Sequence, residues 1–243
     1  LISRPMARII EPLSLMGATF KSTGRAQLPI VVTGAEPLMP IRYEMPLPSA
    51  QVKSAILLSA LGAKGESIII EPIPTRDYTE QLLKRFGANI STKINENGHN
   101  EIKIIGEPEL KQTKIDVPGD PSSAAFLIVA ALITPDSKIT IKEVGMNHFR
   151  TGLFDVLTEM GGNLTIENYT SESGEPIADI TASSSNLHGT AVKAAYAPRM
   201  IDEYPILSVA AAFASGETRL EGLEELKVKE SNRLTAIKKM LGD

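Results

Sequence analysis

Three alanine-rich apolar stretches are the clearest feature of the hydrophobic pattern. They cover residues 50–61, 122–133 and 204–214, and each would form a helix that is apolar on almost every side. Helices of this kind are usually buried inside a domain. Each is followed by a Gly or Asp turn, a short alternating strand, a polar turn and an amphipathic helix. The predicted strands are residues 67–71, 138–143 and 218–222, and the predicted amphipathic helices are residues 77–86, 150–160 and 231–240.

Four glycines recur where amphipathic helices are predicted to end. Gly17, Gly87, Gly161 and Gly242 each follow apolar residues at helical spacing. Glycine adopts a positive φ readily and so terminates a helix. Successive members lie roughly 70 to 80 residues apart, which is longer than the roughly 20–50 residues of the common solenoid repeats. The sequence therefore predicts an α/β protein built from about three copies of one unit, the first of them cut short.

Composition narrows the class of protein. The 243 residues are 42% hydrophobic and 22% charged, as in soluble globular proteins, and no apolar run reaches the roughly eighteen residues of a membrane-spanning helix. Cysteine is absent, which excludes disulfides, thiolate nucleophiles and Cys-based metal sites. A net charge of −4 disfavours nucleic-acid binding but allows anionic small molecules. We expect a cytoplasmic protein without a membrane partner, whose natural N-terminus is missing because the sequence does not begin with Met.

Three Pro-containing loops lead directly into the alanine-rich helices and are candidates for anion binding. They are residues 48–51, 118–123 and 198–203. Free backbone N–H groups and the helix dipole favour anions at helix starts, and Ser hydroxyls add donors. Plain helix capping would account for any one of them. Asp202 lies in the third loop, where a carboxylate is either a cap or a general base.

Basic residues lie near these helix starts. Arg76 is predicted in a strand-to-helix turn, and Arg4 lies just before the first helix. Lys229 and Arg233 are four residues apart, so that on a helix they would share a face. Arginine suits phosphate or carboxylate through its planar fork, and lysine supplies a point charge. An ordinary solvated helix pair between Glu230 and Arg233 is the alternative interpretation.

Five motifs, in this order and at this spacing, resemble those of the EPSP synthase family. They are Pro48–Ala55, Thr75–Asp77, Pro118–Ala125, Met200–Pro205 and Val228–Leu234, and together they extend over essentially the whole chain. The opening Arg4-Pro5-Met6 and the Ser49–Lys53 stretch resemble the bacterial class II enzymes, many of which tolerate glyphosate.

The resemblance implies a fold and a domain division. The fold is the α/β, two-domain enolpyruvyl transferase fold, an inside-out α/β barrel of repeated βαβαββ units with buried helices and outer sheets. Substrates bind between the two domains of family members. Residues 1–117 would be the later part of the N-terminal-side domain, a partial repeat plus one full repeat. Residues 118–243 would be the earlier part of the second domain, about two repeats.

The resemblance also implies a reaction and its residues. The enolpyruvyl group of phosphoenolpyruvate would pass to the 5-hydroxyl of shikimate 3-phosphate, in aromatic amino acid biosynthesis, with neither a metal nor a redox cofactor. Such chemistry needs an acid and a base held apart, and cations for two phosphates and a carboxylate. Implied ligands of shikimate 3-phosphate are Ser49, Ala50, Gln51, Arg76, Asp202 and Lys229. Those of phosphoenolpyruvate are Arg4, Gln51, Glu230 and Arg233. The implied catalytic residues are Asp202 as base, Glu230 as proton shuttle, and Lys229.

Part of the family's machinery falls outside this chain. The family also uses a Lys, a Ser and an Arg near its natural N-terminus, a Gly-rich loop, and further Arg and Lys residues near its C-terminus. Because the sequence resembles an internal fragment lacking both ends, we expect no useful synthase activity from it alone. The full-length protein is expected to be a monomer.

Two other functions remain open at this point. The sister enolpyruvyl transferase that acts on UDP-N-acetylglucosamine shares the fold and the chemistry, but often carries a reactive Cys. The Ser49–Gln51 and Lys229–Arg233 motifs favour shikimate 3-phosphate over that substrate. A non-catalytic binding module of the same fold is the second alternative. Nucleic-acid-processing enzymes with related repeats are disfavoured by the acidic balance.

Overall fold

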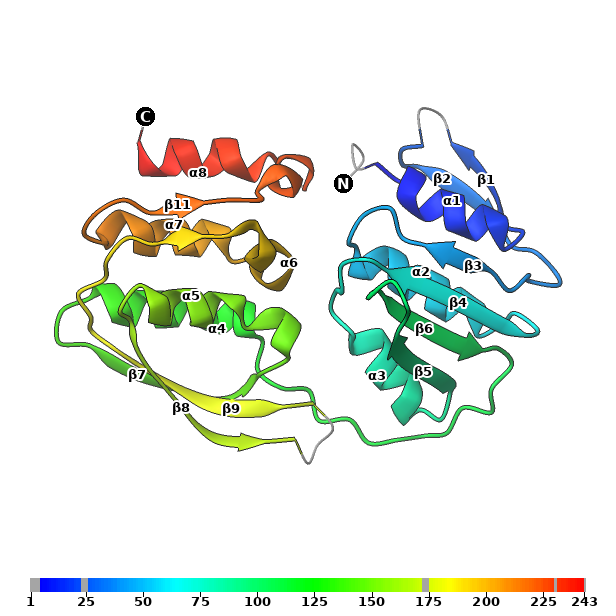
Figure 1. Cartoon of the computed structure of the whole chain (residues 1–243), viewed down its shortest axis with the longest axis horizontal. Coiled ribbons are helices and arrows are strands. Elements are labelled where there is room, and N and C mark those ends of the chain that lie inside the picture. Colours follow the sequence, from blue (N-terminus) through cyan, green and yellow to red (C-terminus); the bar gives the residue numbers. More distant parts are fainter. Residues whose placement is uncertain (1–4, 23–25, 172–174, 230, 243) are drawn as a thin grey trace. The chain divides into compact units, whose positions relative to one another are not determined.

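The computed structural model describes residues 5–22, 26–171, 175–229 and 231–242. The chain divides into two compact units, residues 1–114 (unit 1) and 115–243 (unit 2), which we describe separately (Figure 1). The domain boundary predicted from the sequence lay at 117/118.

Unit 1 contains a helix with a small hairpin, followed by one complete repeat. The first part is α1 (Ala7–Leu15) with the antiparallel strands β1 (Thr19–Ser22) and β2 (Ile30–Thr33). The repeat is β3 (Arg42–Glu44), α2 (Ala50–Ala60), β4 (Glu66–Glu71), α3 (Tyr78–Arg85), β5 (Asn89–Ile94) and β6 (Asn100–Ile105). The sheet order is β3-β4-β6-β5, in which β3 is parallel to β4 and the other neighbours are antiparallel. The repeat is therefore a βαβαββ unit.

Unit 2 follows the same order of elements. Its first copy is α4 (Pro121–Ile133), β7 (Lys138–Gly145), the 3-10 turn η1 (His148–Arg150), α5 (Gly152–Glu159), β8 (Asn163–Thr170) and β9 (Ile177–Ser183). The sheet order is β7-β9-β8. Where β3 pairs with β4 in unit 1, this copy has only a parallel bridge between Gly119 and Val144.

A further copy completes unit 2. It comprises β10 (Ala191–Val192), η2 (Ala194–Tyr196), α6 (Ala197–Met200), α7 (Tyr204–Phe213), β11 (Arg219–Leu220), η3 (Glu224–Val228) and α8 (Arg233–Leu241). Strands β10 and β11 are parallel, like β3 and β4 in unit 1. The predicted succession of an apolar helix, a strand and an amphipathic helix is thus confirmed. The predicted strand at 218–222 is shorter than expected, and the helix predicted at 150–160 begins as a 3-10 turn.

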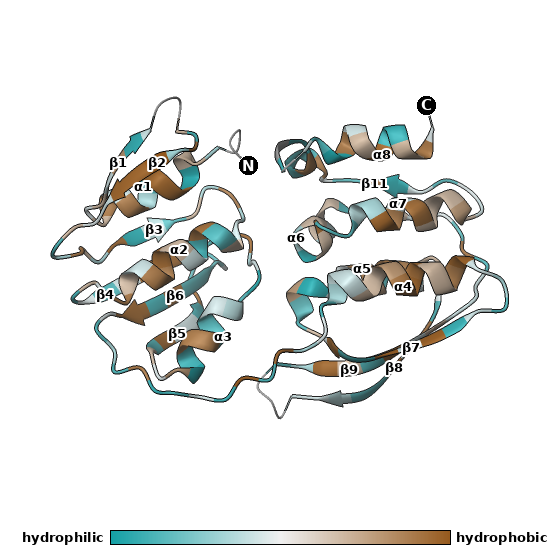
Figure 2. Ribbon diagram, turned by 180° about the vertical axis from the view of Figure 1, so that it is seen from behind, coloured by the Kyte–Doolittle hydropathy of each residue, from teal (hydrophilic) through white to brown (hydrophobic). Residues whose placement is uncertain are grey.

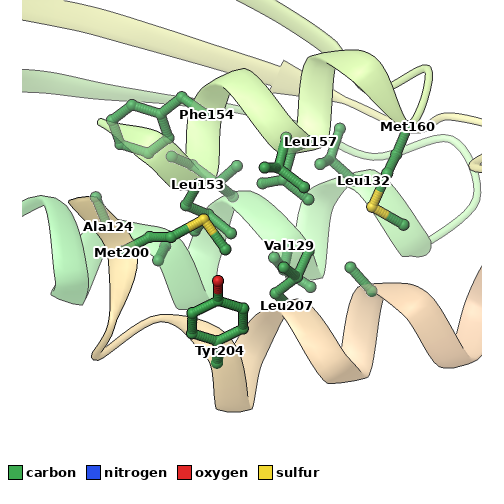
Figure 3. Packing of buried hydrophobic residues seen from close by; sticks show 14 of the residues in the cluster. Ala124, Val129, Leu132, Leu153, Phe154, Leu157, Met160, Met200, Tyr204 and Leu207 are labelled. Atoms are coloured by element: carbon green, nitrogen blue, oxygen red, sulfur yellow. The ribbon is translucent and has the colours of Figure 1, made fainter. Parts of the chain in front are cut away.

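The cores form where the alanine-rich helices pack. In unit 2, α4 packs against α7 and against strands β7 and β9. Figure 3 shows Val129, Leu153, Leu157 and Leu207 meeting between α4, α5 and α7. Leucine and valine side chains from three helices fill this space, and alanines of α4 and α7 belong to the same buried cluster.

The alanine-rich helices were expected to be buried inside a domain, and in unit 2 this holds for only part of their surface. Phe126 and Leu127 on α4 are 59% and 52% exposed, and Phe213 on α7 is 64% exposed. Figure 2 shows both helices largely in hydrophobic colours. A helix that is apolar all round needs neighbours on every side, and the elements of unit 2 cover only part of the circumference.

The terminating glycines behave as predicted. Gly17, Gly87, Gly161 and Gly242 have φ values of 101°, 92°, 85° and 87°. Residues with a Cβ rarely adopt this conformation, so glycine ends each helix at little cost. The repeat can therefore be read in the sequence from these four positions.

Candidate active site

The first candidate helix start lies in unit 1. Ser49 is the N-cap of α2: its backbone is extended, and its Oγ accepts a hydrogen bond of 3.4 Å from the backbone N–H of Val52. Ala50 is the first helical residue, and Gln51 is exposed to solvent. Ser49 is thus a helix cap, as the alternative interpretation held. The N–H groups of this first turn and the helix dipole also favour an anion.

Arg76 lies in the turn between β4 and α3, as predicted, and is half-buried. The turn is fixed through Thr75, the buried residue just before it. Oγ1 of Thr75 donates a hydrogen bond of 2.6 Å to Oε1 of Glu71. The carbonyl of Thr75 accepts a bond of 3.3 Å from Nζ of Lys53. The backbone that carries the Arg76 guanidinium is therefore held by its neighbours.

A buried ionic cluster at this turn was missed by the sequence analysis. Lys53 on α2 is 0% exposed, and its Nζ lies 3.1 Å from Oε1 of Glu71 and 2.7 Å from Oε1 of Glu80. Asn100 on β6 donates a bond of 2.9 Å to Oε2 of Glu71. Lysine and glutamate are almost never fully buried unless paired. A lysine within an apolar helix, and a glutamate ending an isoleucine-rich strand, were the available signals.

Glu80 is the member of this cluster whose carboxyl is least well compensated. Burial raises the pKa of its carboxyl above the usual value, and the Glu71 carboxylate adds to the rise, while the Lys53 ammonium opposes it. Among the described residues, Oε2 of Glu80 has no hydrogen-bond partner. Two carboxylates thus share one ammonium, and the burial of Glu80 favours the protonated form of its carboxyl.

Further predicted site residues lie in unit 2. Asp202, just before α7, accepts a hydrogen bond of 2.9 Å from the guanidinium of Arg233 at the start of α8. Lys229 lies between η3 and α8, and its Nζ is 3.1 Å from Oε1 of Glu225. The structure thus brings a predicted base and a predicted phosphoenolpyruvate ligand into direct contact.

Lys229 and Arg233, which would share a face if both were helical, do not lie on one helix. Helix α8 begins at Arg233, and Lys229 has an extended backbone. The physical reason is Asn232, whose side chain accepts a hydrogen bond of 3.2 Å from the N–H of Thr235 and caps the helix. An N-cap residue is itself non-helical, so the residues before it leave the helix.

Two predicted residues, Arg4 and Glu230, lie outside the described residues. In the described ranges, no group of three or more His, Cys, Asp or Glu side chains is placed to hold a metal ion. None of the helices in those ranges has the length and apolar character needed to cross a membrane.

The start of α4 carries a polar network that the sequence only partly indicated. Asp120 caps the helix by accepting bonds from the N–H groups of Ser122 and Ser123 at 3.2 and 3.0 Å. Arg150 donates to Oδ1 of Asp120 at 2.9 Å and to Oγ of Ser122 at 2.6 Å. The Ser122 hydroxyl in turn donates to the buried Glu203 carboxylate. Burial alone would raise the pKa of Asp120, but it is lowered by a 2.8 Å hydrogen bond from the Ser123 hydroxyl, by the two backbone N–H groups and by the Arg150 charge.

The third predicted helix start, residues 198–203, has a structural role. Arg199 donates to the carbonyl of His148 at 2.9 Å and to Oδ2 of Asp155 at 2.8 Å. It therefore ties α6 to the beginning of α5. Glu203 occupies the N-cap position of α7 without making a side-chain capping bond.

Solved structures identify the class to which this fold belongs. NikO, an enolpyruvyl transferase from Streptomyces tendae, matches with a TM-score of 0.69 over 90% of this chain and 51% of its own. At 19% identity this likeness shows the fold alone. An EPSP synthase from Acinetobacter baumannii matches with a TM-score of 0.81 and 45% identity over 98% of this chain and 53% of its own. The predicted enolpyruvyl transferase fold is thereby confirmed.

Sequence comparison then gives the family. The model of the family described as EPSP synthase (3-phosphoshikimate 1-carboxyvinyltransferase) matches residues 1–242, and this chain belongs to that family. A protein named 3-phosphoshikimate 1-carboxyvinyltransferase from Parvibaculum lavamentivorans is 52% identical over 96% of this chain and 52% of its own length. One of the same name from Granulibacter bethesdensis is 52% identical over 98% of this chain and 53% of its own. The chain spans about half the length of the curated relatives it matches.

Proposed function

We propose that this chain supplies part of an active site that transfers the enolpyruvyl group of phosphoenolpyruvate to the 5-hydroxyl of shikimate 3-phosphate, with release of phosphate. The observation that carries the proposal is the family match over residues 1–242, together with relatives of that name at 52% identity. Since the chain spans about half of those relatives, the reaction is ascribed to the whole protein. The pathway would be aromatic amino acid biosynthesis.

In this proposal, unit 1 binds the phosphate of shikimate 3-phosphate. The backbone N–H of Ala50 and the hydroxyl of Ser49 lie at the start of α2, where the helix dipole favours a negative charge. Arg76 adds a guanidinium that can form two parallel hydrogen bonds to phosphate oxygens. Gln51, exposed on the same first turn, would reach both substrates.

Unit 2 would carry the acid–base chemistry. Asp202 takes the proton of the 5-hydroxyl as that oxygen bonds to C2 of phosphoenolpyruvate, and Glu230 delivers a proton to C3. The tetrahedral intermediate then loses a C3 proton and expels phosphate, which restores the double bond. The Arg233 guanidinium, 2.9 Å from Asp202, has five N–H donors and can orient the base while binding phosphoenolpyruvate. Lys229 would contact the shikimate hydroxyls, and Arg4 would bind phosphoenolpyruvate with Arg233.

The remaining parts of the proposal concern the whole protein. It would be a monomeric cytoplasmic enzyme that needs neither a metal nor a redox cofactor. The chain alone is expected to show no useful turnover, because it spans about half the length of the relatives that carry this name.

Two measurements test the proposal. Calorimetric titration of the 243-residue chain is expected to give a heat of binding with shikimate 3-phosphate and none with UDP-N-acetylglucosamine. The reverse preference would assign the chain to the sister transferase. A coupled phosphate-release assay with both substrates is expected to show no turnover by the chain alone. Ordinary turnover would overturn the expectation that the chain alone is not sufficient for the reaction.

A further inference from the structure

The buried Lys53 ammonium has no part in the reaction described above, yet it contacts three segments around the Arg76 turn. From α2 it reaches Glu71 at the end of β4, the carbonyl of Thr75 in the turn, and Glu80 on α3. The distances are 3.1, 3.3 and 2.7 Å. Its side chain is 0% exposed, so none of these contacts is shared with bulk water.

Lys53 is also tied directly to the other phosphate-binding element. Its backbone N–H donates the ordinary bond of the first helical turn, 3.1 Å long, to the carbonyl of Ser49, so the Lys53 side chain leaves α2 one turn after the cap. Helices α2 and α3, already joined by the Lys53–Glu80 pair, are also joined by a hydrogen bond of 2.6 Å between the hydroxyls of Ser54 and Thr79. One lysine therefore links the Ser49 helix start with the turn that carries Arg76.

We propose that Lys53 is a positioning residue for the shikimate 3-phosphate site, which fixes the Arg76 turn relative to the start of α2 through its bonds to Glu71, Thr75 and Glu80. This inference rests on the proposed function of the Ser49 and Arg76 elements. Lys53 itself does not touch the substrate. Its role is to keep two groups that bind one phosphate at a constant separation.

Energetics favours a role beyond stability. Burying an ammonium and two carboxylates carries a desolvation penalty, and well-packed apolar residues of similar volume often stabilise a core as much or more. What an apolar residue cannot do is hydrogen-bond the Thr75 carbonyl and two carboxylates from different elements at once. The cluster provides fixed geometry, which is what a site for a planar guanidinium and a phosphate needs.

Three variants of the 243-residue chain separate positioning from stability. Lys53→Met removes the ammonium and leaves the two carboxylates buried. The triple variant Lys53→Met, Glu71→Gln, Glu80→Gln removes all three charges and is expected to recover much of the lost stability. Lys103→Met is the matched control, because Lys103 pairs with Glu66 at 3.3 Å in the same unit, and both side chains are partly exposed.

The two measurements are amide hydrogen exchange over residues 72–79 and calorimetric affinity for shikimate 3-phosphate. Lys53→Met and the triple variant are expected to exchange faster in this segment and to bind about tenfold or more weakly, since small misplacements in a site cost that much. Lys103→Met is expected to match the parent chain in both. The triple variant is no more negative than the parent cluster, so its lower affinity for an anion would not be electrostatic repulsion.

The outcomes are separable. Two results would overturn the positioning role. One is that affinity for shikimate 3-phosphate recovers together with stability in the triple variant. The other is that amide exchange over residues 72–79 is unchanged in both Lys53 variants. If the parent chain gives no heat with shikimate 3-phosphate, the proposed function of this half-site fails. In that case the exchange result alone decides whether Lys53 holds the turn. If Lys53→Met does not fold, the triple variant provides both measurements.

Discussion

The two units build the same junction, a capped helix start beside a strand-to-helix turn, with different chemistry. In unit 1 the fully buried Lys53 fixes the turn by donating a hydrogen bond to the carbonyl of Thr75. In unit 2 the corresponding position, four residues after the N-cap, is the apolar Ala124, and Arg150 instead reaches back from the turn to Asp120 at the helix cap. The repeat therefore specifies the backbone arrangement, and each unit fixes its turn in its own way.

The electrostatic consequences differ in sign. In unit 1 burial raises the pKa of Glu80, whereas in unit 2 hydrogen bonds and Arg150 outweigh burial and lower the pKa of Asp120. In unit 1 the buried carboxylates of Glu71 and Glu80 share the ammonium of Lys53. In unit 2 the partly exposed carboxylate of Asp120 accepts several hydrogen bonds. The stability of the two units should therefore respond differently to mutation and to pH.

The largest expected effect is that of Lys53→Met on unit 1. Removing one partner of a buried ionic cluster leaves uncompensated charge, and the free energy of unfolding of unit 1 is expected to fall by about 3–5 kcal/mol. Hydrogen exchange of the β4 and β6 amides, compared with those of β9 in unit 2, measures this change. The exposed pair serves as the control, since Lys103→Met is expected to cost less than about 1 kcal/mol. Equal losses from the two variants would contradict the distinction.

The corresponding substitution in unit 2, Arg150→Met, is expected to cost less stability than Lys53→Met. Arg150→Met removes two hydrogen bonds, but Asp120 has a side chain that is 50% exposed, so water replaces part of what is lost. We expect a loss of about 1 kcal/mol in unit 2, measured by the exchange of its β9 amides. A loss as large as that of Lys53→Met would mean that both units depend equally on their cations.

The pH dependence of this loss has a definite sign. A carboxyl with a lowered folded-state pKa contributes stability that is present above its unfolded pKa and is lost as pH falls through the folded value. Arg150 helps to lower the pKa of Asp120. The difference between the parent chain and Arg150→Met should therefore shrink as Asp120 is protonated in acid. A difference that grows on acidification would contradict this assignment.

Glu80→Gln should show the opposite pH dependence. A carboxyl with a raised folded-state pKa contributes stability that is fully present below the ordinary glutamate pKa and is lost as pH rises through the folded value. Glutamine has no such proton to lose. The stability of unit 1 in the variant, relative to the parent chain, is therefore expected to increase from acid to neutral pH. Urea unfolding at several pH values measures it, and a flat or falling difference would be evidence against the raised pKa.

A small gain in stability, and not a loss, is expected from a change in the core of unit 2. The Tyr204 hydroxyl is buried without a hydrogen-bond partner among the described residues, and burial raises its pKa to about 12. Figure 3 shows it among apolar side chains near Met200. Tyr204→Phe removes this unpaired group, and a gain of about 1 kcal/mol in unfolding free energy is expected. A loss would indicate that the hydroxyl has a partner in solution.

Local patterns were sufficient to predict the repeat. The three alanine-rich helices and the terminating glycines appear where the sequence places them, because both depend on residues close together in the chain. Helix α8 begins at Arg233, two residues after the start predicted at 231, because Asn232 caps the helix. Cap geometry is a local competition that periodicity alone does not resolve.

The candidate site could be predicted only in part. The positions of Ser49 and Arg76 at a helix start and a turn follow from motif and local pattern. The Lys53 cluster and the contacts of Arg150 and Asp202 were not foreseen, because each joins residues from different elements. A buried charge is recognised when its partners are known, and a single sequence does not supply those partners.

The most direct test of the account compares the binding of shikimate 3-phosphate with that of shikimate, which shows how much the phosphate contributes to binding in unit 1. We expect calorimetric titration of the 243-residue chain to give a heat of binding with shikimate 3-phosphate that is absent with shikimate, which lacks the phosphate. Arg76→Ala should weaken that binding by about tenfold or more, since a charge-assisted bond to phosphate is lost. Equal binding of both ligands, or binding of shikimate 3-phosphate unaffected by Arg76→Ala, would contradict the central claim that the α2 start and the Arg76 turn form the phosphate site.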